Sequence, residues 1–325
     1  MSKPARIPAA ARADALATKL ARQVIKQRVH AALHYWERVA KRDKPRVEDI
    51  HQLRVWSRRA IAAIQLFAPL LAAEPAAELL EILNKARKRA GKARDCDVLL
   101  QTLDKSTRGA LAEALEALLD GRAEAAEKLR RSYRKRVRSG DAREALQQLQ
   151  KRIPTGGDKS NESPIEFGVW FQLQFAVVTA TFLKQLRPAK PLPSRIHPLR
   201  IEGKRVRYAL EIGLPSLPKR TGKELYASLE NLQEQLGAIC DDQALAEQYR
   251  ELAAALQGKQ QAQLRKEAGR HDSQAQSGVR KFLSWWRAAG GRKKLQQQFA
   301  AILAPAEVAR QPRTRRKTSA QRKSK

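Results

Sequence analysis

Residues 50–59 read IHQLRVWSRR and residues 196–205 read IHPLRIEGKR, so one basic, amphipathic pattern occurs twice in the chain. The two copies lie 146 positions apart, and the same offset places Gly91 on Gly237 and Asp95 on Asp241. Two anchor regions that share one offset without a gap indicate duplication of a structural unit. The repeat therefore predicts two similar halves.

Each copy predicts a helix with one apolar face and one cationic face. On a wheel of 100° per residue the apolar side chains gather on one side, and the bases form a ridge on the other. The ridge consists of His51, Arg54 and Arg58 in the first copy and of His197, Arg200 and Lys204 in the second. The first ridge contains no carboxylate, and like charges at this spacing destabilise a helix. We therefore expect an anion to neutralise the ridges.

The composition supports a polyanionic partner. The chain has 325 residues with 65 Lys and Arg against 33 Asp and Glu, a net charge of +32. Such an excess favours nucleic acid, anionic membranes or polyphosphate as partners. Apolar residues make up 42% of the chain, too many for disorder throughout. Two cysteines exclude a disulfide-stapled scaffold and suit a reducing cytosol, and no signal peptide is evident at the N-terminus.

Strong helix formers dominate between Pro and Gly breaks, and no alternating β-branched stretch predicts a sheet. The fold class predicted is all-α: two four-helix bundle units related by internal duplication, with a disordered basic C-terminal tail. The stretch 168–183 is almost wholly apolar, yet it is shorter than a membrane span and predicts a helix buried inside the protein. The predicted boundaries are a flexible N-terminus (1–14), a first repeat (15–152), a linker (153–164), a second repeat (165–300) and the tail (301–325).

The motif H-x-L-R-V-x-x-R-R, followed some thirty residues later by a glycine and R-D-x-D-V, resembles the signature of the CHAD domain, the conserved-histidine α-helical domain. A weaker second signature is present in the second half. The matching residues are His51, Leu53, Arg54, Val55, Arg58, Arg59, Gly91, Arg94, Asp95, Asp97 and Val98, and then His197, Leu199, Arg200, Lys204, Arg205, Arg207, Tyr208, Leu236, Gly237 and Asp241. The chain departs from the pattern at Ala90, where the family usually has Leu, and Cys240 takes the place of Arg94 in the second copy, so we expect an asymmetric anion site.

The resemblance covers about residues 15–300. It implies two four-helix units related by a pseudo-twofold axis, binding of inorganic polyphosphate in a basic groove or pore between them, and association with cytoplasmic polyphosphate granules. The leading interpretation is a non-catalytic binding protein, for which we expect no cofactor and no metal; the residues before the first motif are too few for the triphosphatase-like domain of some members. The residues expected to bind polyphosphate are His51, Arg54, Arg58, Arg59, Lys88, Arg94, His197, Arg200, Lys204, Arg205 and Arg207.

Two other functions stay open on the sequence. The tail and the basic run 128–138 could bind DNA or RNA. A metal-dependent phosphohydrolase could use histidines and aspartates, and several pairs were weighed for it. Asp95 and Asp97 are better explained by helix capping or by pairing with a nearby Arg such as Arg94. The pair His271-Asp272 lacks the rest of an HD-phosphohydrolase site, and His30 and His34 have metal-ligand spacing without the glutamate of a zinc motif.

Overall fold

The computed structural model describes residues 8, 11–102, 112–153, 165–187, 193–288 and 290–304. Within these ranges the regular structure is helical, which confirms the all-α fold class, and the one β-bridge joins Leu16 to Glu166. The helices are α1 (Ala17–Ala40), α2 (Val47–Leu66), α3 (Ala73–Thr102), α5 (Ala112–Tyr133), α6 (Asp141–Lys151), α7 (Phe167–Gln185), α8 (Ile196–Gly213), α9 (Lys219–Ala254), α10 (Gly258–Arg287) and α11 (Arg292–Leu303), with 3₁₀ turns at 68–70, 193–195 and 214–216.

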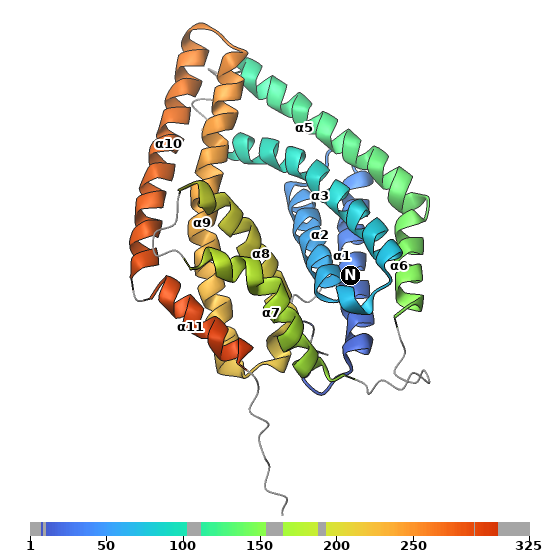
Figure 1. Ribbon diagram of the computed structural model, residues 1–325. Coiled ribbons are helices and arrows are strands. Elements are labelled where there is room, and N and C mark those ends of the chain that lie inside the picture. Colours follow the sequence, from blue (N-terminus) through green and yellow to red (C-terminus); the bar gives the residue numbers. More distant parts are fainter. Residues whose placement is uncertain are drawn as a thin grey trace, which may run out of the picture.

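The two halves of the chain form two neighbouring groups of helices (Figure 1). In the first, α1, α2 and α3 pack in sequence and α5 and α6 cover them; in the second, α9 and α10 form a long hairpin beside α7, α8 and α11. The described chain has five α-helices per half instead of the four predicted. In the first half a π-helical elbow (Arg134–Arg138) and Gly140, at φ 107°, separate α5 from α6. In the second half the break lies between Arg287 and Arg292.

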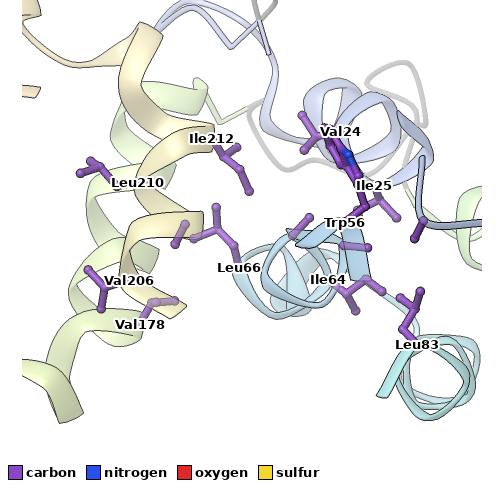
Figure 2. Packing of buried hydrophobic residues seen from close by; sticks show 14 of the residues in the cluster. Val24, Ile25, Trp56, Ile64, Leu66, Leu83, Val178, Val206, Leu210 and Ile212 are labelled. Atoms are coloured by element: carbon purple, nitrogen blue, oxygen red, sulfur yellow. The ribbon is translucent and has the colours of Figure 1, made fainter. Parts of the chain in front are cut away.

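The halves share one apolar core where α2 packs against α8. Figure 2 shows Leu66 of α2 and Ile212 of α8 directed toward each other from these two helices. Both side chains are at most 1% exposed, so the junction is as fully buried as the interior of either half. The α2 and α8 helices, which carry the duplicated pattern, are therefore held side by side by their apolar faces.

A second, smaller apolar cluster joins the halves at the far end of the long hairpin. There the end of α3 and the start of α5 meet α9 and α10, as Figure 1 shows for the helices concerned. Tyr249 of α9 is 1% exposed, and its hydroxyl lies 3.0 Å from the hydroxyl of Thr102 of α3. The halves thus meet at two separate places.

The domain boundaries differ from the predicted ones at both ends. Ala11 is buried, and the backbone N–H of Gly168 donates to the carbonyl of Ala13 at 2.9 Å, so residues 11–14 pack on the fold and are not a free terminus. The helix α11 ends at Leu303 with Ile302 buried, so the folded part extends past residue 300. The predicted linker after Ile153 and the tail after Ala304 lie outside the described residues.

The apolar helix α7 is not covered on all sides, contrary to the prediction. Its aromatic face is buried: Phe167, Phe171 and Phe175 stack in a row and continue onto Phe299 of α11. The opposite face is open, because Val169, Leu173 and Val177 are 56%, 62% and 69% exposed. None of the helices in the described ranges is long and apolar enough to cross a membrane.

Candidate functional site between α2 and α8

A cleft of about 520 Å³ lies where the cationic faces of α2 and α8 meet α3. Its walls combine bases with a few apolar and amide groups and a single carboxylate, that of Glu202. The lining bases are Arg54, Arg58, Arg87, His197, Arg200, Lys204 and Arg205. The structure therefore brings the two predicted ridges together, because the apolar faces of α2 and α8 pack on each other and leave their basic flanks adjacent.

Equivalent arginines in the two halves make equivalent ion pairs. Nη1 of Arg54 lies 3.6 Å from Oδ1 of Asp95, and Nη2 of Arg200 lies 2.8 Å from Oδ1 of Asp241. Each pair joins the ridge helix to the next long helix, α2 to α3 and α8 to α9. Although the α2 ridge has no carboxylate along its own sequence, the fold brings a carboxylate from the next long helix against each ridge.

The Arg54–Asp95 and Arg200–Asp241 pairs do not neutralise the cleft. Both arginine side chains are about one-fifth exposed, whereas Asp95 and Asp241 are 55% and 64% exposed at the edge of the site. Burial raises the pKa of Asp95, and the charge of Asp241 adds to that rise while Arg54 opposes it. The two aspartates are therefore close enough to repel each other, and their carboxylates face solvent at the edge of the cleft.

The deeper bases are electrostatically strained. Burial lowers the pKa of Arg58 to about 10, and nearby arginines contribute to the lowering. Burial, together with the charges of Arg58 and Arg200, lowers the pKa of Lys204 to about 7. Burial is the largest cause of this low pKa, and the neighbouring cations add to it. Because Arg58 belongs to α2 and Lys204 to α8, the strain arises from the junction of the two halves.

Of the remaining predicted residues, His197 and Arg205 line the cleft, whereas His51, Lys88 and Arg94 are not among its lining residues. His197 is exposed on its wall, and Arg205 lines it while pairing with Glu202 at 3.7 Å. His51 lies one turn before Arg54, and burial followed by the charge of Arg94 lowers its pKa. Lys88 is exposed on the α3 turn between Arg87 and Gly91.

Arg59 and Arg207, both predicted to bind phosphate, are not among the residues that line the cleft. Arg59 is 4% exposed and donates from Nε and Nη2 to the Glu211 carboxylate at 2.8 and 3.1 Å. Arg207 donates to the Tyr226 hydroxyl at 3.1 Å and lies 3.5 Å from the same carboxylate. Both side chains are thus held by the Glu211 carboxylate, on the same helices that carry the ridges.

Glu211 is the centre of a buried polar network that sequence reasoning missed. Its side chain is fully buried, and Arg28 of α1 lies 3.8 Å from it while donating to backbone carbonyls of α2 and α8. Glu211, Arg28 and Arg59 therefore tie α1, α2 and α8 together by charge. The position equivalent to Glu211 in the first half is Gln65, so the duplication contained no signal for this network.

Arg87 and Tyr208 also line the cleft without having been predicted as site residues. Arg87 lies one turn before Gly91, whose carbonyl accepts a hydrogen bond from Nη1 of Arg54 at 3.2 Å. The signal for Arg87 was its position on the α3 face that ends in the duplicated glycine. Its counterpart in the second half is Gln233, whose side-chain amide donates to the Arg200 carbonyl. The cleft is therefore asymmetric at this position, in addition to the Arg94-to-Cys240 difference.

Three of the other candidate catalytic residues, Asp97, His271 and Asp272, are paired with nearby side chains. Asp97 pairs with Arg122 and not with Arg94. His271 is buried and bonds Asp242 through Nδ1 at 2.8 Å, while Asp272 pairs with Arg250. Within the described ranges no group of three or more His, Cys, Asp or Glu side chains is placed to hold a metal ion.

Comparison with known proteins agrees with this architecture. The family model of the CHAD domain matches residues 23–250. The chain belongs to the CHAD-domain family. A search of curated proteins returns no match. Among solved structures, the CHAD domain from the plant Ricinus communis is similar with a TM-score of 0.64 at 20% identity, covering 93% of this chain and 98% of that one. PptA from Streptomyces chartreusis is similar with a TM-score of 0.53 at 13% identity, covering 88% and 99%. At these identities the two structures show that the CHAD fold is shared.

Proposed function

We propose that this CHAD protein binds inorganic polyphosphate, without catalysis, in the cleft between α2 and α8. The observation that carries the proposal is the convergence of six Lys and Arg side chains from three helices on one cleft whose lining contains a single carboxylate. Lys204, with its pKa of about 7, is the clearest member of this group. The family is known from polyphosphate-related contexts.

An extended phosphate chain fits the chemistry of the cleft. Guanidinium groups make charge-assisted, often bidentate, hydrogen bonds to phosphate oxygens. All four Lys and Arg side chains of the two ridges line the cleft. A bound polyanion restores the charged form of Lys204 and relieves the repulsion between Arg58 and Arg200. Release of counterions adds to the binding free energy and makes it strongly dependent on salt.

The size of the cleft favours a thin chain over a duplex. Its volume of about 520 Å³ lies within the range of small-molecule pockets, roughly 300–1,000 Å³. Such a space accepts a few phosphate units in an extended conformation, whereas a DNA duplex can touch only its rim. Long polyphosphate would continue past the cleft along the basic surface. We propose that the protein associates in this way with cytoplasmic polyphosphate granules.

The test compares long-chain polyphosphate with duplex DNA at equal phosphate concentration. Arg58→Gln with Lys204→Gln is expected to weaken polyphosphate binding at least tenfold, since each lost charged hydrogen bond costs roughly 1.5–3 kcal/mol. The matched control is Arg265→Gln with Lys266→Gln, which removes the same charge from an exposed face of α10. Equal losses in both double variants would contradict a specific site, as would DNA affinity equal to polyphosphate affinity.

A phosphate-release assay separates binding from hydrolysis. We expect the wild-type protein to release no phosphate from the chain, with or without added divalent metal. Release that a chelator abolishes would replace the binding proposal with a phosphohydrolase.

A further inference from the structure

The open face of α7 carries half of the large apolar side chains that are exposed on the described surface. Six large apolar side chains in the described ranges are at least half exposed, and three of them lie on one face of α7. The stripe consists of Val169, Leu173 and Val177, at 56%, 62% and 69% exposure, and Ile165, 52% exposed, lies two residues before the helix begins. Contiguous exposed apolar surface of this kind marks an interaction site more often than scattered single residues do.

The stripe is also the least charged part of a very basic chain. Between Glu166 and Lys184 there is no charged residue, whereas the whole chain has a net charge of +32. Two copies of the protein repel each other wherever their basic surfaces meet. Along α7 that repulsion is weakest, and burial of apolar side chains favours contact.

The two ends of the stripe are complementary in charge. Glu166 lies at the N-terminal end of α7 and Lys184 at its C-terminal end, about 27 Å apart at 1.5 Å per residue. Both side chains are exposed, and no ion pair is found for either of them in the described part of the chain. If two α7 helices pack antiparallel, each Glu166 meets the Lys184 of the second copy, and Leu173 meets Val177.

We propose that α7 is a dimerisation surface, on which a second copy of this chain packs its own α7 antiparallel about a twofold axis. Ala176 and Ala180 are exposed on the same face and allow the two backbones to approach closely. Such an interface is self-complementary, as a twofold contact requires. The proposal does not rest on polyphosphate binding, because α7 contributes no residue to the cleft.

A second copy fits the stripe better than an unrelated partner. When two α7 helices lie antiparallel, the acidic end of each faces the basic end of the other, and the apolar middles face each other. One helix face offers less area than the standard interface of about 800 Å² per partner. We therefore expect a weak dimer with a dissociation constant in the micromolar range. Its pairing register would be set by Glu166 and Lys184.

Sedimentation velocity of the full chain between about 1 and 100 µM, spanning the micromolar range, tests the proposal. The wild type is expected to shift from monomer to dimer with concentration. Leu173→Glu is expected to raise the dissociation constant at least about tenfold, as loss of a central contact does. The matched control is Leu119→Glu, which places the same charge at a leucine that is 50% exposed on α5 and is expected to leave the dimer unchanged.

A charge swap tests the antiparallel register. Glu166→Lys and Lys184→Glu are each expected to weaken the dimer, because each places like charges opposite one another, and the double variant is expected to restore it. Circular dichroism of each variant checks that the fold is kept. The proposal is overturned if the wild type stays monomeric over the whole concentration range. A monomeric wild type that binds lipid vesicles would overturn it in the same way. It is equally overturned if Leu173→Glu and Leu119→Glu behave alike, or if the double swap fails to rescue.

Discussion

Nη2 of Arg200 lies 2.8 Å from Oδ1 of Asp241, in the same relation that Arg54 has to Asp95 in the first half. In each case a carboxylate that is mostly exposed holds a guanidinium that is mostly buried. The aspartates therefore act as internal counter-ions to groups that we assign to an external anion. Binding of polyphosphate has to compete with them.

Removing these carboxylates should increase polyphosphate affinity. In Asp95→Asn with Asp241→Asn, the guanidinium groups lose their internal partners and the cleft loses two negative charges that repel phosphate. We expect the dissociation constant for polyphosphate to fall by about threefold or more, as expected for exposed ion pairs worth up to about 1 kcal/mol. The control Asp272→Asn breaks the Arg250 pair on α10 and is expected to change affinity less than twofold. A double variant that binds more weakly would show that the aspartates position the arginines.

Polyphosphate binding should weaken as pH rises above 7. The pKa of Lys204 is about 7 in the free protein, and a bound polyanion raises it toward its ordinary value. Below pH 7 the lysine is already protonated and affinity is greatest; above pH 7 binding has to take up a proton. We expect affinity to fall between pH 7 and 9, with proton uptake in calorimetry that depends on the buffer. Lys204→Arg stays charged over this range and should remove that component; an unchanged pH profile would exclude Lys204.

The same lysine should destabilise the unliganded fold. Its folded pKa of about 7 lies below the ordinary value of 10.5, so the unfolded chain binds the proton more tightly. The loss in the free energy of unfolding is complete below pH 7 and vanishes above about pH 10.5. Replacing Lys204 by an uncharged residue should therefore stabilise the fold most at low pH. We expect Lys204→Met to raise the melting temperature at pH 6 and to raise it less at pH 9. A lower melting temperature at pH 6 would show that packing of the lysine stem outweighs the charge penalty.

Glu211→Gln should be the most damaging single change in charge. The carboxylate is fully buried and is the acidic group that the buried Arg28 and Arg59 share, so its loss removes one counter-charge from both. Removing one partner of a buried ion network costs roughly 3–5 kcal/mol in the free energy of unfolding. Chemical denaturation measures this loss, with the exposed Asp241→Asn expected to cost less than about 1 kcal/mol. A cost below 1 kcal/mol for Glu211→Gln would mean that the junction is held by apolar packing alone.

Deleting residues 306–325 should reduce affinity without removing selectivity. This segment lies outside the described residues, and its sequence has bases without an apolar face. Its charges can neutralise any dense polyanion, and salt screens them. We expect truncation to weaken DNA binding more than polyphosphate binding at low salt, measured by paired titrations at two salt concentrations. Loss of polyphosphate binding with DNA binding intact would move the site from the cleft to the tail.

The sequence by itself determined the helical class and the two ridges. Helix propensity and the 3.6-residue period act over neighbouring residues, and the offset of 146 made the α2 and α8 patterns visible twice. The same local rules placed Arg54 and Arg200 on the flank of their helices opposite the apolar face. They could not show that Asp95 and Asp241 would reach back from the next long helix, because that contact depends on helix packing.

Tertiary structure decided which bases face the cleft and which are internal. Arg58 and Arg59 are consecutive and equally basic in the sequence, yet one lines the cleft and the other is buried on Glu211. The difference arises from a rotation of 100° between neighbours on a helix, combined with a partner that lies 152 positions away. The open stripe of α7 has the same origin: its composition predicted a helix buried inside the protein, but Val169, Leu173 and Val177 on the face opposite its aromatic residues are exposed. The number of covered sides of a helix depends on how many other elements pack around it. The residue pattern of one segment cannot predict how many elements those are.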